Sequence, residues 1–202
     1  MIEPARAVNH PRLPFLYVIA SWCYVAGRLE KAVRYCDAGQ TVVIHSPDRV
    51  LFGFESWLGG VHNFLDQPER SIEWSRLLLA RSPDPYANIR AGLVFGLLRA
   101  GSRAEAVAVA KDLIEAADAI ANPWALSFVL LAYGIACGDV DSVRARGAMR
   151  RGLVIAQGSG NRYNETHLAS ILGRLEADTA TRWLHSITWL SPFATTTTRA
   201  TT

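Results

Sequence analysis

Gly101-Ser102-Arg103-Ala104-Glu105-Ala106-Val107 is the stretch of sequence that decides the fold of this chain. It follows an apolar run that ends at Leu98, and glycine readily adopts the positive φ that terminates a helix. Ser102 can cap a new helix, and Glu105 follows three residues later, at the spacing of a capping box. The stretch therefore predicts two helices joined by a tight turn, with the small Ala106 allowing them to pack closely.

Three other stretches share this layout and indicate an internal repeat. Gly27, Asp66 and Gly138 occupy the position of Gly101, and the successive intervals between the four markers are 39, 35 and 37 residues. Tetratricopeptide (TPR) repeats have a period of about 34 residues and contain two helices each. We therefore expect an all-α fold, a TPR-like α–α superhelix of about five antiparallel helical hairpins. The alternative is an ordinary all-α bundle in which four unrelated turns use similar residues.

Proline and glycine positions, together with the spacing of apolar residues, set the expected bounds of these hairpins. The ten helices are expected at residues 15–26, 29–43, 48–64, 68–81, 85–100, 103–120, 123–137, 141–157, 162–177 and 179–189. Residues 1–13 are expected to be an N-terminal remnant or tail, and residues 14–190 the repeat domain. The threonine-rich stretch 191–202 is expected to be a disordered, low-complexity tail.

The composition is typical of a protein with a large core and little net charge. Hydrophobic residues make up 50% of the 202 residues, charged residues make up 19%, and the formal net charge is +3. This charge is too small to require a nucleic-acid partner. The apolar runs 13–26 and 125–137 are shorter than the ~20 residues that a membrane-spanning helix needs. We therefore expect neither a membrane nor a nucleic-acid partner, and the sequence does not indicate the oligomeric state.

The three cysteines lack the spacing of a zinc or redox motif. Cys23 and Cys36 are expected on the two helices of one hairpin, where they could be neighbours. Core packing is the alternative for these residues and for Cys137, because free cysteines are often buried. An odd number of cysteines without an export signal is typical of a reducing compartment, so we expect a cytoplasmic protein.

The chain lacks the sequence patterns of common catalytic and cofactor sites. It contains no GxxxxGKS or GxxxxGKT phosphate loop, no GxSxG elbow and no HExxH zinc motif. None of its five histidines pairs with a histidine, cysteine or acid at ligand spacing on one helix. Glu165 and His167 come nearest, but residues two apart point to different faces. We therefore expect no catalytic, cofactor-binding or metal-binding residue, no cofactor and no enzymatic activity.

Two groups of side chains are candidates for binding. Arg146 and Arg150 share a face of the helix expected at 141–157, and an arginine face can hold phosphate or another anion. The alternative is a solvated helix surface, where positive charge near the C-terminal end is mildly favourable. Trp57, Trp74 and Trp124 are candidates for binding a partner, because aromatic residues of a helical array either fill the gaps between hairpins or line its concave face.

Four stretches in the second half of the chain resemble a known group of proteins. They are 132–134 (Ala-Tyr-Gly), 149–153 (Met-Arg-Arg-Gly-Leu), 159–162 (Ser-Gly-Asn-Arg) and 172–177 (Leu-Gly-Arg-Leu-Glu-Ala). They are similar to the TPR-like repeat region of large actinobacterial regulators, which also carry an adenylate-cyclase-like or ATPase module and often a LuxR-type helix-turn-helix. The resemblance covers residues 13–190 and implies a non-catalytic regulatory module that binds a protein partner. It carries over no active site, because the residues in the matching stretches are of the kind that pack helices together.

The resemblance also implies that this chain is truncated relative to that family, since its cyclase, ATPase and helix-turn-helix are absent. With suitable codons, the DNA that encodes the stretch from Ser191 would encode, in another reading frame, an amino-acid sequence that resembles the family's. Residues 191–202 are therefore hypothesised to be a frameshifted tail. Three alternative functions remain: a nucleic-acid-binding regulator acting through the Arg144–Arg151 helix, a small-molecule sensor with a pocket between hairpins, and a truncated gene remnant without independent function.

Overall fold

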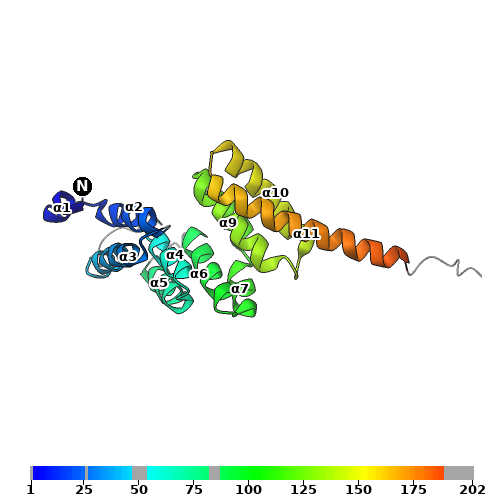
Figure 1. The fold of residues 1–202 in the computed structure, drawn as a ribbon, viewed down its shortest axis with the longest axis horizontal. Coiled ribbons are helices and arrows are strands. Elements are labelled where there is room, and N and C mark those ends of the chain that lie inside the picture. Colours follow the sequence, from blue (N-terminus) through cyan, green and yellow to red (C-terminus); the bar gives the residue numbers. More distant parts are fainter. Residues whose placement is uncertain (1, 26, 47–53, 82–86, 189–202) are drawn as a thin grey trace, which may run out of the picture.

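The computed structural model describes residues 2–25, 27–46, 54–81 and 87–188, with side chains described up to residue 177 of the last range. Over these residues the protein consists of eleven helices and contains no strand (Figure 1). The prediction of an all-α fold is confirmed. The expected tail at 191–202 and the expected helix start at 48–53 lie outside the described residues.

The helices follow one another along the molecule, and most of them pack against their neighbours in the sequence (Figure 1). Their bounds are α1 (Ile2–Ala7), α2 (Leu13–Val25), α3 (Leu29–Ile44), α4 (Ser56–Phe64), α5 (Pro68–Arg81), α6 (Ala87–Arg99), α7 (Arg103–Ala110), α8 (Leu113–Ala117), α9 (Pro123–Cys137), α10 (Ser142–Gly158) and α11 (Arg162–Thr188). Close pairs are α2 with α3, α4 with α5, α6 with α7, α9 with α10, and α10 with α11. Successive pairs are joined through both of their helices: α5 packs closely against α6, α4 contacts α2, α3 and α6, and α6 contacts α9.

The turn at Gly101 has the geometry that the sequence predicts. Its φ is +77°, and the amide of the next residue donates to the carbonyl five positions earlier, which closes the end of α6. Asp66 has φ +56° and the same hydrogen bond at the end of α4, so these two turns are equivalent. Gly138 is different, because its φ of −54° lies in the ordinary helical region. The turn instead recurs at Gly160, with φ +69°, between α10 and α11.

Three local predictions are wrong. Ser102 occupies the N-cap position of α7, but its side chain makes no capping hydrogen bond, and Glu105 instead accepts from Arg76 of α5 at 2.7 Å. The helix expected at 103–120 is divided into α7 and α8 by a turn at residues 111–112. The two helices expected at 162–177 and 179–189 form one continuous helix, α11, over the described residues, and residues 174–188 contain no glycine or proline that would end it.

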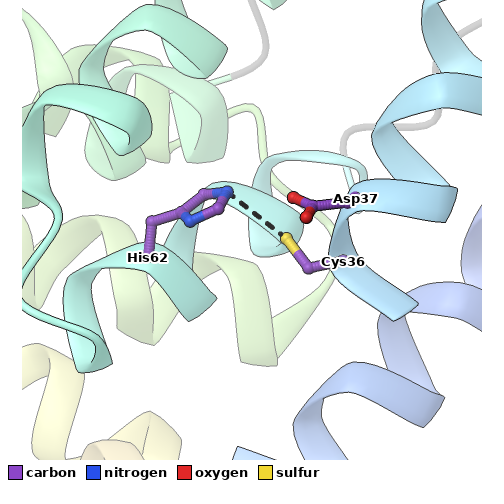
Figure 2. A group of neighbouring side chains, drawn as sticks. All are labelled: Cys36, Asp37 and His62. Atoms are coloured by element: carbon purple, nitrogen blue, oxygen red, sulfur yellow. Dashed lines mark hydrogen bonds between the residues drawn. The ribbon is translucent and has the colours of Figure 1, made fainter. Parts of the chain in front are cut away.

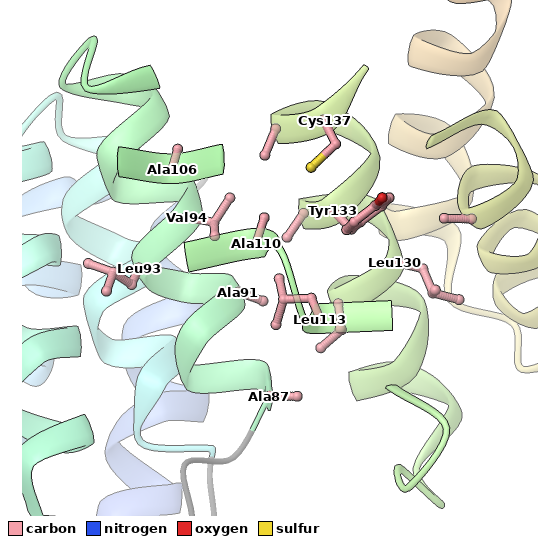
Figure 3. Packing of buried hydrophobic residues seen from close by; sticks show 14 of the residues in the cluster. Ala87, Ala91, Leu93, Val94, Ala106, Ala110, Leu113, Leu130, Tyr133 and Cys137 are labelled. Atoms are coloured by element: carbon pink, nitrogen blue, oxygen red, sulfur yellow. The ribbon is translucent and has the colours of Figure 1, made fainter. Parts of the chain in front are cut away.

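The largest core lies where α6, α7 and α8 meet α9 (Figure 3). Small residues dominate it, and Ala91, Ala106, Ala110 and Ala132 are all fully buried. Smaller cores lie between α2, α3, α4, α5 and α6 at one end, and between α9, α10 and α11 at the other. The core is therefore built from contacts between neighbouring helices, and the first helix of each pair remains available to line a shared surface.

Candidate functional site

A groove lined by aromatic side chains runs across the first helix of successive pairs. Its lining comes from α2, α4, α6, α9 and α11, and the cavity has a volume of about 480 Å³. This surface, called here the aromatic groove, contains six aromatic rings: Trp22, Trp57, Phe64, Phe95, Phe128 and Tyr163. A volume of this size is within the range of ~300–1,000 Å³ that is typical of binding sites.

The six rings contact one another and form a continuous wall. Trp22 packs edge-on against Trp57 and Phe64, with centroids 5.7 and 5.2 Å apart, and Phe128 packs between Trp57 and Phe95 at 5.6 and 4.9 Å. Each contact of this type adds about 0.5–1.5 kcal/mol beyond the burial of its area. The wall is therefore held in shape before anything binds.

Trp22 is anchored by two features of α4. Its indole Nε1 donates to the carbonyl of Trp57 at 2.9 Å. Its ring also lies against Gly60, where a Cβ atom would come within 2.9 Å of Trp22 Cζ2. Gly59, next to it, leaves similar space for Trp74, at 2.9 Å. Because neither glycine has a side chain, α4 can pack closely against the ring of Trp74 at Gly59 and against the ring of Trp22 at Gly60.

A second, larger hollow of about 970 Å³ adjoins the aromatic groove and shares Trp22, Trp57 and Tyr163 with it. Large apolar side chains are exposed at the two hollows: Phe15 (39%), Ile19 (45%), Phe64 (48%), Trp124 (45%) and Tyr163 (41%). Contiguous exposed apolar surface of this kind marks binding sites more often than single exposed residues do.

A few polar groups are placed among the rings of the groove. Oδ1 of Asn63 is buried and has no hydrogen-bond partner among the residues that the structure describes. Arg99 is paired with Asp66 at 3.0 Å, and the His167 ring packs edge-on against Tyr163 at 4.4 Å. Burial raises the pKa of Tyr163. These groups do not form the adjacent nucleophile and base that covalent catalysis uses, so the groove is suited to binding apolar groups.

The three tryptophans singled out from the sequence have different surroundings. Trp57 lines both hollows, and Trp124 lines the larger one. Trp74 is 4% exposed, and its indole donates to the carbonyl of Glu55 at 2.9 Å, so it packs in the core and has no surface to offer a partner. Trp22 was not predicted as a binding residue. Its helix is apolar along nearly its whole length, so the sequence does not show which side packs in the core and which side lines the groove.

Three of the four arginines of α10, namely Arg144, Arg150 and Arg151, pair with acidic side chains from other parts of the array. Arg150 pairs with Glu176 at 2.7 Å, and Arg151 pairs with Asp118 at 2.7 Å. Arg146 is half-buried. Because acidic partners neutralise this face of α10, it resembles inter-helix packing more than an open anion site.

Arg144 of the same helix pairs with Glu115 of α8. A backbone hydrogen bond at Glu115, followed by the hydrogen bond from Arg144, lowers the pKa of Glu115. The ion pair therefore favours the ionised carboxylate of Glu115 and links α8 to α10.

A second polar group lies where α3 packs against α4, on helices adjacent in the chain (Figure 2). Sγ of Cys36 is 3.5 Å from Nε2 of His62 and 3.0 Å from the carbonyl of Leu58, and Asp37 lies beside them. Burial raises the pKa of Cys36 to about 12, and burial also lowers the pKa of His62. The spacing of residues along one helix does not reveal this group, because its members lie on two helices and meet only through packing.

The three cysteines are free thiols; Cys36 and Cys137 are buried, and Cys23 is exposed and lines the larger hollow. The expectation that Cys23 and Cys36 could be neighbours gains no support from these positions. Within the described ranges, none of the helices combines the length and apolar character that spanning a membrane would need. Comparison with known proteins adds no identity: no protein-family model matches the chain, and no curated protein matches its sequence.

Proposed function

We propose that this chain is a TPR-like helical array that binds a protein partner through the aromatic groove and has no catalytic activity of its own. The observation that carries the proposal is the origin of the groove, whose lining comes from α2, α4, α6, α9 and α11 in turn. Solenoids of helix pairs present an extended concave surface of this kind and use it for binding. The resemblance to the repeat regions of LuxR-type regulators supports a regulatory role.

Three of the seven ion pairs that join distant segments of the chain within the described residues have a separation close to the TPR period. Three aspartate–arginine pairs each join residues 33 positions apart: Asp37–Arg70, Asp66–Arg99 and Asp118–Arg151. A repeated packing unit brings equivalent positions together once in each period. The separation of 33 residues is close to the ~34-residue period of TPR arrays.

The occupant that fits the groove best is a short peptide segment of the partner that carries aromatic or branched aliphatic side chains. The six rings offer apolar contact to such side chains, and Phe64 and Tyr163 remain 48% and 41% exposed for that contact. The groove is therefore expected to recognise a large apolar anchor.

A peptide-display library of random sequence tests this proposal. The full chain is expected to select peptides that share one or two large apolar residues, and their binding is then measured by titration calorimetry. Phe64→Ala is expected to weaken binding by roughly tenfold or more, because truncation of a central aromatic anchor commonly costs ≥ 2 kcal/mol. The accompanying loss of stability should be about 0.5–1.5 kcal/mol, since Phe64 is half-exposed and gives up one edge-on contact with Trp22.

Val154→Ala is the matched control, because Val154 on α10 is 69% exposed and does not line the groove. It is expected to bind the selected peptides as tightly as the unmodified chain does. A library that yields no apolar consensus, or peptides that bind equally well to Phe64→Ala, would contradict the proposal.

A small-molecule sensor is a second candidate, favoured by the volumes of the two hollows. Volumes of about 480 and 970 Å³ are in the range of sites for compact apolar ligands. Thermal shift measurements against a metabolite panel distinguish the two functions. Stabilisation by a small apolar compound, lost in Phe128→Ala and combined with no selection of peptides, would favour the sensor.

A further inference from the structure

Cys36, Asp37 and His62 bring one sulfur, one carboxylate and one imidazole nitrogen together, and we propose that they form a Zn²⁺-binding site. The three ligand atoms lie within 4.8 Å of one another (Figure 2). The residues come from α3 and α4, and none of them lines the aromatic groove. The site is thus separate from the proposed partner surface, and it differs from the sequence expectation that the chain has no metal ligand.

The distance between the sulfur and the nitrogen matches tetrahedral zinc. Zinc binds cysteine sulfur at about 2.3 Å and histidine nitrogen at about 2.0–2.1 Å, which at a tetrahedral angle places the two atoms about 3.6 Å apart. Sγ of Cys36 and Nε2 of His62 are 3.5 Å apart. One ion can therefore bridge both atoms without any movement of α3 relative to α4.

The contact between His62 and Gln67 fits the tautomer of His62 that a metal ligand needs. Nδ1 lies 3.3 Å from Oε1 of Gln67, which can accept a proton carried on Nδ1, and the same oxygen accepts from Arg70 at 3.5 Å. In that tautomer the lone pair of Nε2 is free, and it faces the amide of Gln40, whose Nε2 is 3.2 Å away and whose Oε1 is 3.5 Å away. A histidine held by its other nitrogen in this way is typical of zinc sites.

Asp37 supplies the third ligand and the route by which an ion enters. Its side chain is 45% exposed, and Oδ1 accepts from Arg70 at 2.8 Å. A carboxylate has two oxygens, so Oδ2 can coordinate while Arg70 orients the group. The carboxylate has to close by at most about 1.5 Å, from the 4.8 Å that bounds the three ligand atoms, to reach tetrahedral spacing. The positive charge of Arg70 opposes a cation, and the carboxylate and the cysteine thiolate together offset it.

The donor set favours zinc over the hard cations. Sulfur and imidazole ligands suit Zn²⁺, whereas Mg²⁺ and Ca²⁺ take oxygen ligands. On binding, the Cys36 thiol loses its proton to solvent as the zinc–sulfur bond forms, and water completes the fourth position. The bound ion would join α3 to α4 and so fix the first helix pair against the second.

Cobalt titration of the full-length, reduced chain tests the site, because Co²⁺ takes the place of Zn²⁺ and reports its ligands by absorption. One Co²⁺ per chain is expected, with a thiolate-to-cobalt charge-transfer band and the visible bands of tetrahedral cobalt, all abolished by one equivalent of Zn²⁺. Cys36→Ser should lose the charge-transfer band. Cys137→Ser, which changes another buried cysteine, should keep it.

The other two ligands have matched controls of their own. His62→Gln is compared with His45→Gln, since His45 is exposed. Asp37→Asn is compared with Asp139→Asn, because Asp139 is also a surface aspartate paired with an arginine. Each ligand variant is expected to weaken Co²⁺ binding by roughly tenfold or more, while each control leaves the affinity unchanged.

Absence of the charge-transfer band in the unmodified chain would overturn the proposal, as would a band that persists in Cys36→Ser. Circular dichroism first establishes that each variant is folded. If Cys36→Ser does not fold, the test rests on Asp37→Asn. The side chain of Asp37 is half-exposed, so this substitution is expected to leave the fold intact. Equal cobalt affinities of Asp37→Asn and Asp139→Asn would then remove Asp37 from the site and leave too few ligands for it.

Discussion

The indole ring of Trp22 on α2 packs edge-on against the phenol ring of Tyr163 on α11, with centroids 6.4 Å apart and ring planes at 80°. The two residues lie near opposite ends of the described chain. Their contact means that the array curves until its first and last long helices meet beside the same groove. The groove is therefore a property of the whole array, and no single helix pair can form it.

A double-mutant cycle measures how strongly this contact joins the two ends. Trp22→Leu and Tyr163→Leu are expected to show a coupling energy of about 0.5–1.5 kcal/mol in urea unfolding, which is the usual range for an aromatic pair. Tyr24 stacks on Tyr35 instead, so Tyr24→Leu combined with Tyr163→Leu should be additive within about 0.5 kcal/mol. Additivity in both cycles would indicate that the ends of the array do not meet in solution.

A close approach between α9 and α10 predicts opposite effects for two glycines. A Cβ atom at Gly134 would lie 2.5 Å from Cγ and Cε of Met149, whereas a Cβ at Gly147 would meet nothing within 4 Å. Gly134→Ala is expected to lower the free energy of unfolding by about 1–3 kcal/mol, because overpacking displaces the methionine. Gly147→Ala should raise it by up to about 1 kcal/mol, because alanine is the better helix former. Urea denaturation of both variants checks this, and a stabilising Gly134→Ala would show that α9 and α10 are not packed this closely.

The Glu115–Arg144 pair predicts a specific pH dependence. A carboxyl group whose pKa is lowered in the folded state contributes stability above its unfolded pKa, and loses it as the pH falls through the folded pKa. The contribution of Glu115 is therefore complete at neutral pH and is lost below about pH 4.5. Carboxyl NMR titration should show the pKa of Glu115 rising in Arg144→Gln and unchanged in Arg103→Gln, which removes a different pair. An unchanged pKa in Arg144→Gln would mean that the pair does not form.

Thiol labelling distinguishes the three cysteines. Cys23 is exposed, whereas Cys36 is buried and has a pKa of about 12, so only roughly one thiol in ten thousand is ionised at pH 8. Burial also raises the pKa of Cys137. Iodoacetamide in the presence of a chelator should modify Cys23 first, with Cys36 and Cys137 reacting only after denaturation, as read by peptide mass spectrometry. Modification of Cys36 at the rate of Cys23 would contradict its burial.

Local sequence signals predict some helices to the residue and miss others for identifiable reasons. α5 and α9 have the expected bounds, 68–81 and 123–137, because a proline starts each one and the sequence soon after each end carries a helix breaker, Pro83 after α5 and Gly138 after α9. The turn between α7 and α8 has no such signal. Leu113 and Ala117 continue the buried stripe of Ala106 and Ala110, so the apolar spacing is the same with or without a break.

The candidate sites depend on tertiary packing more than the fold does. Tryptophan is equally consistent with a core and with a surface, and only packing against Gly59 buries Trp74 while Trp57 remains at the groove. Cys36 and His62 are 26 residues apart, and no periodicity along either helix links them. The unsatisfied Oδ1 of Asn63 also has no sequence signal, since asparagine is common near helix ends.

Methyl NMR mapping of a selected peptide on the full-length chain tests the central claim most directly. Binding in the aromatic groove should shift the methyl resonances of its lining residues, Leu98, Leu131, Ile135 and Ile171, and leave that of Val154 on α10 unchanged. Phe64→Ala should remove these shifts at the same peptide concentration. Shifts that instead gather at Val143 and Val154, with the groove methyls unmoved, would contradict the assignment of the groove as the partner-binding surface.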